Sequence, residues 1–248
     1  MKSYEDIKYG CFEEQVLDVH IPDADKFPVF IYFHGGGLTF GTQKQKFTEK
    51  LVEKGVAVVS GLYRKYPAAK YPDFIYDAAA IVNWTKKNIG NYGEAEGIYV
   101  GGSSAGGYLS QMLCFDPKYL GIYNITNNDI AGYFHDAGQP TSHFNVLKER
   151  GIDSRRVIVD ESAPLFHIKD GVIYPPMEIV VSDNDMENRY EQTMLLYSTL
   201  KHFRHDMDKV YLNVRKDSRH CSYVGAFDDE GNSLFADMIY DFIKKVNG

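Results

Sequence analysis

The most constraining feature of the sequence is the stretch Gly102-Ser103-Ser104-Ala105-Gly106. It follows an apolar run at 98–100 and precedes a helix-like run at 108–115. Glycines two positions before and after a serine allow a strand and a helix to approach closely, and they hold the serine in a tight turn with its hydroxyl exposed. The pattern specifies only three residues, so it indicates a catalytic serine only if the rest of the chain contains the other residues that such a site needs.

Apolar runs alternate with amphipathic runs along the rest of the chain. They predict strands and helices in turn: strands at 28–33, 56–60, 98–101, 130–134, 177–181 and 210–214, and helices at 47–54, 73–88, 187–202 and 233–246. Such alternation predicts an α/β fold with a mostly parallel, doubly wound sheet and helices on both faces. Residues 7–19 are expected to add an antiparallel edge. Functional residues should then follow the carboxyl ends of the strands.

The length of 248 residues fits a single domain over residues 1–248. One region, 135–176, breaks the alternation and offers only a short helix-like stretch at 145–150. About 40 residues is long for a connection between two core strands. We interpret this region as an insertion or lid before the strand at 177–181; a surface excursion that covers a sheet edge is the alternative.

Composition excludes several classes of protein. The net charge of −7 argues against a nucleic-acid-binding protein, and it gives no reason to expect attraction to anionic membranes. Cys11, Cys114 and Cys221 form neither a disulfide framework nor a metal motif. No apolar run reaches the length of a membrane span of about 18 residues, and the polar start does not read as a signal peptide. We therefore expect a cytoplasmic protein.

A serine hydroxyl is a poor nucleophile unless a base accepts its proton. His220 is the candidate base, because it lies between the last predicted strand and the last predicted helix. Asp185, four residues beyond the strand at 177–181, is the favoured carboxylate to orient it, and Asp183 is the main rival. The order serine, acid, histidine is that of α/β-hydrolases.

A glycine-rich loop, His34-Gly35-Gly36-Gly37, directly follows the strand at 28–33. Successive glycines expose backbone N–H groups, which can stabilise an oxyanion. The N–H groups of Gly36, Gly37 and Ala105 are the predicted oxyanion hole. Without the serine turn downstream, the same glycines would read as a plain flexible turn.

These motifs carry a resemblance to a known family. The loop at 34–37 resembles the His-Gly-Gly-Gly motif of the hormone-sensitive-lipase-like esterases, which are α/β-hydrolases, and it looks closest to the small bacterial branch with feruloyl and acetyl-xylan esterase-like proteins. The segment 63–84, with its Tyr-Arg…Pro…Asp…Trp pattern, and the serine turn are also similar to that branch. Ser182, where the family usually has glycine, and Cys221, where it usually has a small residue, depart from the pattern.

Four residues are weaker candidates for the wall of a substrate pocket: His34, Gln139, His143 and Phe144. His34 could instead support the glycine loop. His135, Asp136 and His143 match no common metal-ligand spacing, so no metal is expected. The chemistry needs no cofactor.

Taken together, these residues predict a serine carboxylesterase that hydrolyses small acyl esters through an acyl-enzyme. By resemblance, the substrate is an acetylated or feruloylated carbohydrate. A peptidase, thioesterase or lactone hydrolase with the same residues is the alternative, as is a hydrolase fold that only binds. The expected partner is a small-molecule ester, and a homodimer is left open.

Overall fold

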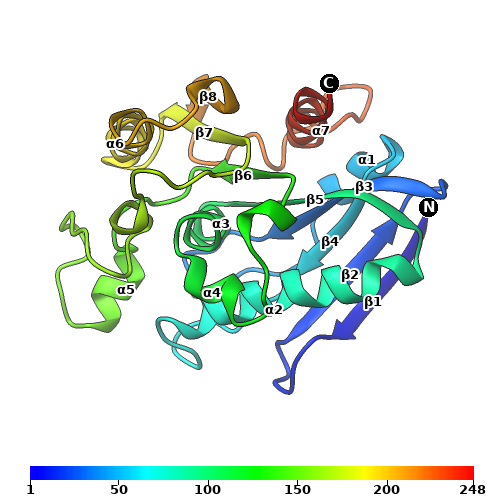
Figure 1. The fold of residues 1–248 in the computed structure, drawn as a ribbon, viewed down its shortest axis with the longest axis horizontal. Helices are drawn as coiled ribbons and strands as arrows, with labels where there is room; N and C mark the ends of the chain where they lie inside the picture. Colours follow the sequence, from blue (N-terminus) through cyan, green and yellow to red (C-terminus); the bar gives the residue numbers. More distant parts are fainter.

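All eight strands form one sheet in the computed structural model, which describes residues 1–248 (Figure 1). Their order across the sheet is β1-β2-β4-β3-β5-β6-β7-β8. The strands are β1 (Lys2–Lys8), β2 (Val16–Ile21), β3 (Lys26–Phe33), β4 (Ala57–Gly61), β5 (Glu94–Ser103), β6 (Gly132–Asp136), β7 (Met177–Asn184) and β8 (Val210–Arg219). Only the pairings of β2, with β1 and β4, are antiparallel. The predicted α/β fold and mostly parallel sheet are confirmed.

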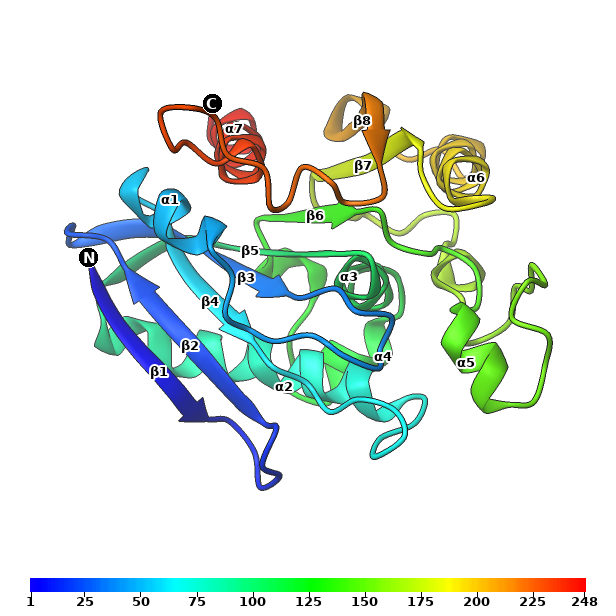
Figure 2. The ribbon, with the colours of Figure 1, turned by 180° about the vertical axis from the view of Figure 1, so that it is seen from behind.

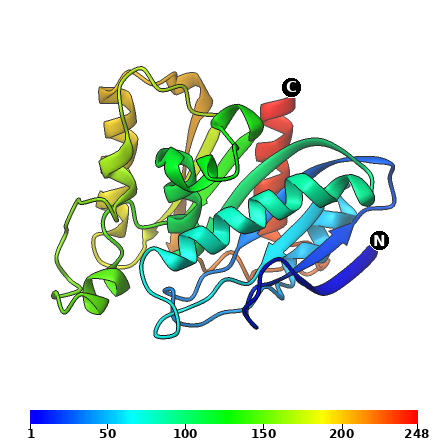
Figure 3. The ribbon, with the colours of Figure 1, turned by 60° about the horizontal axis from the view of Figure 1, so that its bottom comes forward.

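Helices cover both faces of this sheet. They are α1 (Phe47–Glu53), α2 (Asp73–Asn88), α3 (Ala105–Phe115), α4 (Pro117–Gly121), α5 (Phe144–Glu149), α6 (Arg189–His202) and α7 (Leu234–Asn247). The strand β3 shows why two layers form, because Phe30 and Tyr32 pack with α1 and α7 while Val29 and Ile31 pack with α2 and α3. Figure 3 shows α2 in front of the sheet and α7 behind it. None of the helices combines the length and the apolar character needed to cross a bilayer.

The antiparallel edge differs in detail from the prediction. Residues 7–19 were expected to form it, but β1 begins at Lys2 and β2 ends at Ile21, with a turn at 9–15 between them. Residues 3–6 show little alternation of apolar and polar side chains, because β1 is exposed along nearly its whole length. An exposed edge strand lacks the apolar alternation that sequence patterns detect.

The last two strands are longer than predicted, and this positions the site. Residues 215–219, beyond the predicted strand at 210–214, are part of β8, and β7 continues past the predicted 181 through Asn184, which pairs with Arg219. Polar residues can extend a strand because the ladder consists of backbone hydrogen bonds. Asp185 and His220 therefore directly follow the ends of adjacent strands.

The region between β6 and β7 contains α5 and a short 3₁₀ turn, but no strand. Figure 2 shows it beside α3, at the same end of the molecule as α6. Parts of this region are packed: the Tyr108 hydroxyl of α3 donates to the Ser162 carbonyl at 2.8 Å, and the side chains at 141–143 are buried. Residues 151–161 are mostly exposed.

Candidate active site

Ser104 occupies a strained turn between β5 and α3. Its φ of +56° is rare for a residue other than glycine, and such a conformation costs about 1–3 kcal/mol. The surrounding glycines make the turn sterically feasible. A Cβ atom on Gly106 would lie 1.8 Å from the Phe33 carbonyl oxygen, and one on Gly102 would lie 2.6 Å from the same oxygen. This close packing holds the Ser104 hydroxyl at the carboxyl end of the sheet.

His220 connects Ser104 to a carboxylate. Its Nε2 atom lies 2.8 Å from Ser104 Oγ, and its Nδ1 atom lies 2.5 Å from Asp185 Oδ1. The Asp185 side chain is fully buried and also accepts the Met186 N–H at 2.7 Å. With its proton on Nδ1, the neutral imidazole donates to Asp185 and leaves Nε2 free to accept the serine proton.

Asp183, the rival acid, has a different role. Its exposed carboxylate accepts backbone N–H groups from Asp217 at 3.0 Å and from Ser218 at 3.3 Å. These bonds hold the pKa of Asp183 below its usual value. The structure brings Asp185 to His220 and leaves Asp183 to stabilise the backbone of β8.

The glycine loop lies against the serine turn. Gly36 and Gly37 adopt φ values of +113° and +60°, and a Cβ atom on Gly36 would lie 2.1 Å from the Phe40 carbonyl oxygen. No protein acceptor takes the N–H of either glycine. Ala105 is the first residue of α3, so its N–H has no acceptor within the helix. These are the three donors predicted for an oxyanion.

A cavity of about 550 Å³ opens beside Ser104 and His220. The glycine loop forms one side, and the apolar side chains of Phe40, Phe144 and Met186 contribute to the others. Of the four predicted pocket residues, only Phe144 lines this cavity. The cavity gives a small, partly apolar molecule access to the serine hydroxyl.

His34 supports the glycine loop from behind instead of lining the cavity. Its ring stacks on Tyr63 at 4.4 Å, and the Tyr63 hydroxyl donates to the His34 carbonyl at 2.8 Å. Burial lowers the pKa of His34 to about 4, so the ring stays neutral. The neighbouring Arg64 forms an ion pair with Asp77 at 2.8 Å. The Tyr-Arg…Asp pattern thus anchors the glycine loop to α2.

Gln139 and His143 also lie outside the cavity wall. Gln139 accepts the Phe144 N–H at 3.2 Å, and His143 accepts the Asn145 N–H at 3.2 Å, so both hold the start of α5. Asn145 itself lines the cavity and donates its side-chain N–H to the Gly37 carbonyl oxygen. Sequence analysis missed Asn145, because no motif marks a residue that reaches the glycine loop from a distant insertion.

His135, Asp136 and His143 do not converge on a common point. His135 Nδ1 lies 2.9 Å from Ser110 Oγ inside the core, and Asp136 accepts the Tyr223 hydroxyl. No group of three metal-ligating side chains occurs in the chain. Each of the three residues makes its own hydrogen bonds.

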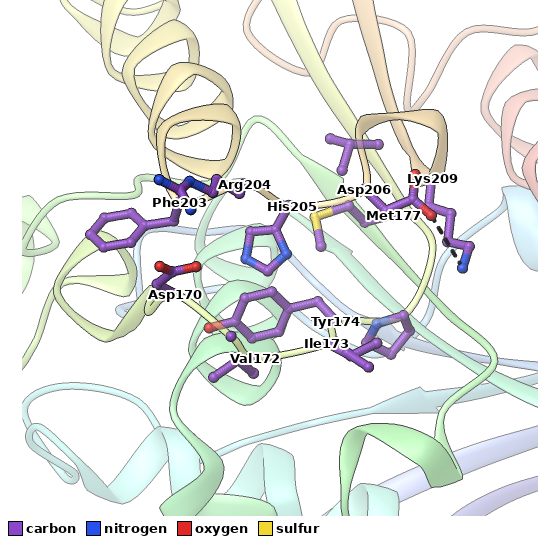
Figure 4. Close-up of a pocket in the computed structure, with 13 residues that line it drawn as sticks. Asp170, Val172, Ile173, Tyr174, Met177, Phe203, Arg204, His205, Asp206 and Lys209 are labelled. Carbon is purple, nitrogen blue, oxygen red and sulfur yellow. Dashed lines mark ion pairs between the residues drawn. The ribbon is translucent and has the colours of Figure 1, made fainter.

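A second cavity, of about 260 Å³, lies at the amino ends of β7 and β8 (Figure 4). His205 lies over the Tyr174 ring there, at 4.5 Å, with Asp170 and Arg204 nearby. No serine, threonine or cysteine lines this cavity, so it lacks the aliphatic hydroxyl or thiol that a histidine base activates in serine and cysteine hydrolases. It lies at the opposite end of the strands from Ser104.

Comparisons with known proteins found relatives and solved structures that are named as esterases. The family model described as BD-FAE matches residues 17–131, which include the glycine loop and Ser104 but neither Asp185 nor His220. Esterase LipQ of Mycobacterium tuberculosis is 27% identical over 209 residues, which cover 73% of this chain and 48% of that protein. Kynurenine formamidase of Danio rerio is 31% identical over 137 residues, which cover 49% and 44%. The chain spans about half the length of these curated relatives.

Solved structures share the whole fold. Esterase B from Lactobacillus rhamnosis superposes with a TM-score of 0.80 at 17% identity, covering 99% of this chain and 86% of that one. A truncated carbohydrate esterase from gut microbiota superposes with a TM-score of 0.78 at 18% identity, covering 100% and 97%. The chain therefore has the α/β-hydrolase fold and is similar to proteins named as esterases.

Proposed function

We propose that this protein is a serine carboxylesterase that hydrolyses small acyl esters. The observation that carries the proposal is the hydrogen-bonded series Asp185–His220–Ser104, with distances of 2.5 and 2.8 Å. Ser104 and His220 of this series line a cavity of about 550 Å³. Relatives named as esterases, including LipQ, support the same activity. A fold that only binds would not need a strained serine with φ of +56° beside a partnered histidine.

The proposed reaction proceeds through an acyl-enzyme. Ser104 Oγ attacks the ester carbonyl while His220 Nε2 accepts its proton and passes it to the departing alcohol. Asp185 orients the imidazole and stabilises its protonated form. The N–H groups of Gly36, Gly37 and Ala105 stabilise the oxyanion, and each such donor contributes about 3–4 kcal/mol. Water activated by His220 then releases the acid.

The substrate proposed is an acetylated or feruloylated carbohydrate. The fold shared with a carbohydrate esterase and the match to the BD-FAE family model support this class. The same three residues also fit a peptidase, a thioesterase or a lactone hydrolase. Similarity to a kynurenine formamidase makes hydrolysis of a formamide the second candidate function.

The decisive experiment compares the wild type with Ser104→Ala on p-nitrophenyl acetate. We expect the variant to lose nearly all hydrolysis, and equal rates would overturn the proposal. A second series then compares acetyl, butyryl and octanoyl esters with acetylated xylo-oligosaccharides, methyl ferulate and an N-formyl aromatic amine. A preference for octanoyl over acetyl would contradict the small-acyl substrate, and a preference for the formamide would favour the second candidate.

We also propose a single domain over residues 1–248 and a cytoplasmic location. Whether the chain is a monomer or a homodimer is a separate question. Light scattering of the purified chain decides that question.

A further inference from the structure

Asp136 is a buried carboxylate directly behind the proposed catalytic residues. It is the last residue of β6, and its side chain is completely buried. In the sheet it pairs with Ser103 on one side and with Val180 on the other. It therefore lies between the strand that carries the nucleophile and the strand that carries the acid, yet none of the reaction steps above uses it.

Asp136 contacts both the serine turn and the histidine loop. Its backbone carbonyl accepts the Ser104 N–H at 2.8 Å. Its side chain accepts the Tyr223 hydroxyl, and Cys221 Sγ lies 3.9 Å from its Oδ2 atom. Asp136 thus contacts Ser104 through its backbone, and it contacts Cys221 and Tyr223 through its carboxylate.

The histidine loop needs such a support. Cys221 follows His220 and adopts φ of +52°, which costs about 1–3 kcal/mol unless surrounding contacts enforce it. Tyr223 is 2% exposed, so its hydroxyl needs a buried acceptor, which Asp136 supplies. These contacts fix the backbone from which the His220 ring projects.

We propose that Asp136 is a positioning residue that holds the His220 loop against the Ser104 turn. It acts through Cys221 and Tyr223 and does not touch the substrate. This inference rests on the proposed function, because it concerns the accuracy of the Ser104–His220 contact. A displacement of about 1 Å in such a contact can cost about 100-fold in rate.

The charge of Asp136 gives the inference a specific signature. Burial raises its pKa to about 6, while the Ser103 and Tyr223 hydroxyls and the nearby His220 oppose that rise. The titratable groups that face it belong to β3, to the histidine loop and to the acid loop: Tyr32, His220, Cys221, Tyr223 and Asp185. The ionised form, present above about pH 6, attracts the imidazolium that forms on His220 during attack.

The test compares Asp136→Asn and Tyr223→Phe with a matched control, Glu178→Gln. Glu178 is a buried carboxyl on the adjacent strand β7, bonded to Asn213 at 2.8 Å and remote from the histidine loop. For Asp136→Asn on p-nitrophenyl acetate we expect kcat to fall about 10-fold to 100-fold with KM within about twofold. The acid limb of the kcat/KM profile should move to lower pH, because the imidazolium loses an attracting carboxylate. Glu178→Gln should change neither kcat nor the profile.

Tyr223→Phe removes only one hydroxyl, so it keeps the inference testable if Asp136→Asn is insoluble. It should lower kcat by a smaller factor and leave the acid limb in place. The inference is overturned if both variants match Glu178→Gln in kcat and in pH profile while Ser104→Ala is inactive. If Ser104→Ala retains full activity, the proposed function itself has failed.

Discussion

His220 Nε2 lies 2.8 Å from Ser104 Oγ, although 116 positions separate the two residues in the chain. They meet because β5 and β8 run in the same direction and end at the same edge of the sheet. The ends of β6 and β7, between them, supply Asp136 and Asp185. The proposed catalytic arrangement is therefore a row of neighbouring strand ends.

Asp185, the proposed acid of this row, should be essential for hydrolysis. Asp185→Asn keeps the shape of the side chain but removes the charge that fixes the His220 tautomer. We expect kcat on p-nitrophenyl acetate to fall by about 10⁴-fold, as in other serine triads. Asp183→Asn is the matched control, because its carboxylate accepts N–H groups from the β8 backbone and from the Asn184 side chain and makes no hydrogen bond to His220, and its kcat should stay near that of the wild type. Loss of turnover in Asp183→Asn alone would exchange the two assignments.

Gly106 should tolerate no side chain. A Cβ atom there would lie 1.8 Å from the Phe33 carbonyl oxygen, so α3 and β3 would have to separate. We expect Gly106→Ala to lower the free energy of unfolding by about 3 kcal/mol or more and to abolish hydrolysis. Gly121→Ala, with nothing within 4 Å of its added Cβ atom, should unfold at the same urea concentration as the wild type or a higher one. Equal urea midpoints for the two variants would contradict this account of the turn.

Buried histidines should make the fold sensitive to mild acid. Burial lowers the pKa of His34 to about 4 and that of His135 to about 3. Unfolded histidine titrates near 6.5, so the unfolded chain binds more protons and stability falls as pH decreases from about 6.5 towards 4. Each histidine contributes a slope of about 1.4 kcal/mol per pH unit. Asp136, with its raised pKa of about 6, acts with the opposite sign between about 3.8 and 6 and offsets part of the slope.

Urea unfolding at several pH values between 7.5 and 4.5 tests this expectation. His135→Asn should flatten the pH dependence of the free energy of unfolding, whatever its effect at neutral pH. His202→Gln, which changes an exposed side chain, should leave the slope unchanged. A His135→Asn slope equal to that of the wild type would show that His135 is not buried in its neutral form.

Phe144 should limit the size of the acyl group. It lines the cavity beside Ser104 and also a neighbouring cavity of about 230 Å³, so its ring helps to separate the two. Phe144→Ala should raise kcat/KM for octanoyl relative to acetyl esters by about 10-fold, because the longer chain gains apolar space. Phe166→Ala, which changes an exposed ring, should leave the ratio unchanged. An unchanged ratio in Phe144→Ala would place the acyl group elsewhere.

Local patterns predicted most of the fold. The helix at 73–88 was predicted at its observed bounds, because its apolar residues recur with helical spacing and pack in one core layer. The strand β5 extends from Glu94 to Ser103, beyond the predicted 98–101, because its polar start is held by pairing with β3 rather than by apolar burial. Strand ends fixed by a neighbour's backbone leave little trace in the sequence.

In the candidate site, too, some residues carry a local sequence signal and others do not. Ser104 and the glycine loop carry local signals, since both need glycine at sterically closed positions. The roles of Asn145 and Asp136 depend on which distant segments meet, so no spacing in the sequence marks them. Composition likewise gave no means to separate Gln139 and His143, which support α5, from Phe144, which lines the cavity.

The central claim is that Ser104 is the nucleophile, and covalent trapping tests it most directly. The protein is treated with a p-nitrophenyl alkylphosphonate, which esterifies activated serine hydroxyls, and is then examined by intact-mass and peptide mass spectrometry alongside residual hydrolysis of p-nitrophenyl acetate. We expect one adduct per chain, on the peptide that contains Ser104, with loss of activity in proportion to labelling and no adduct in Ser104→Ala. Full hydrolysis by a protein labelled stoichiometrically at Ser104, or equal labelling of Ser104→Ala, would contradict the claim.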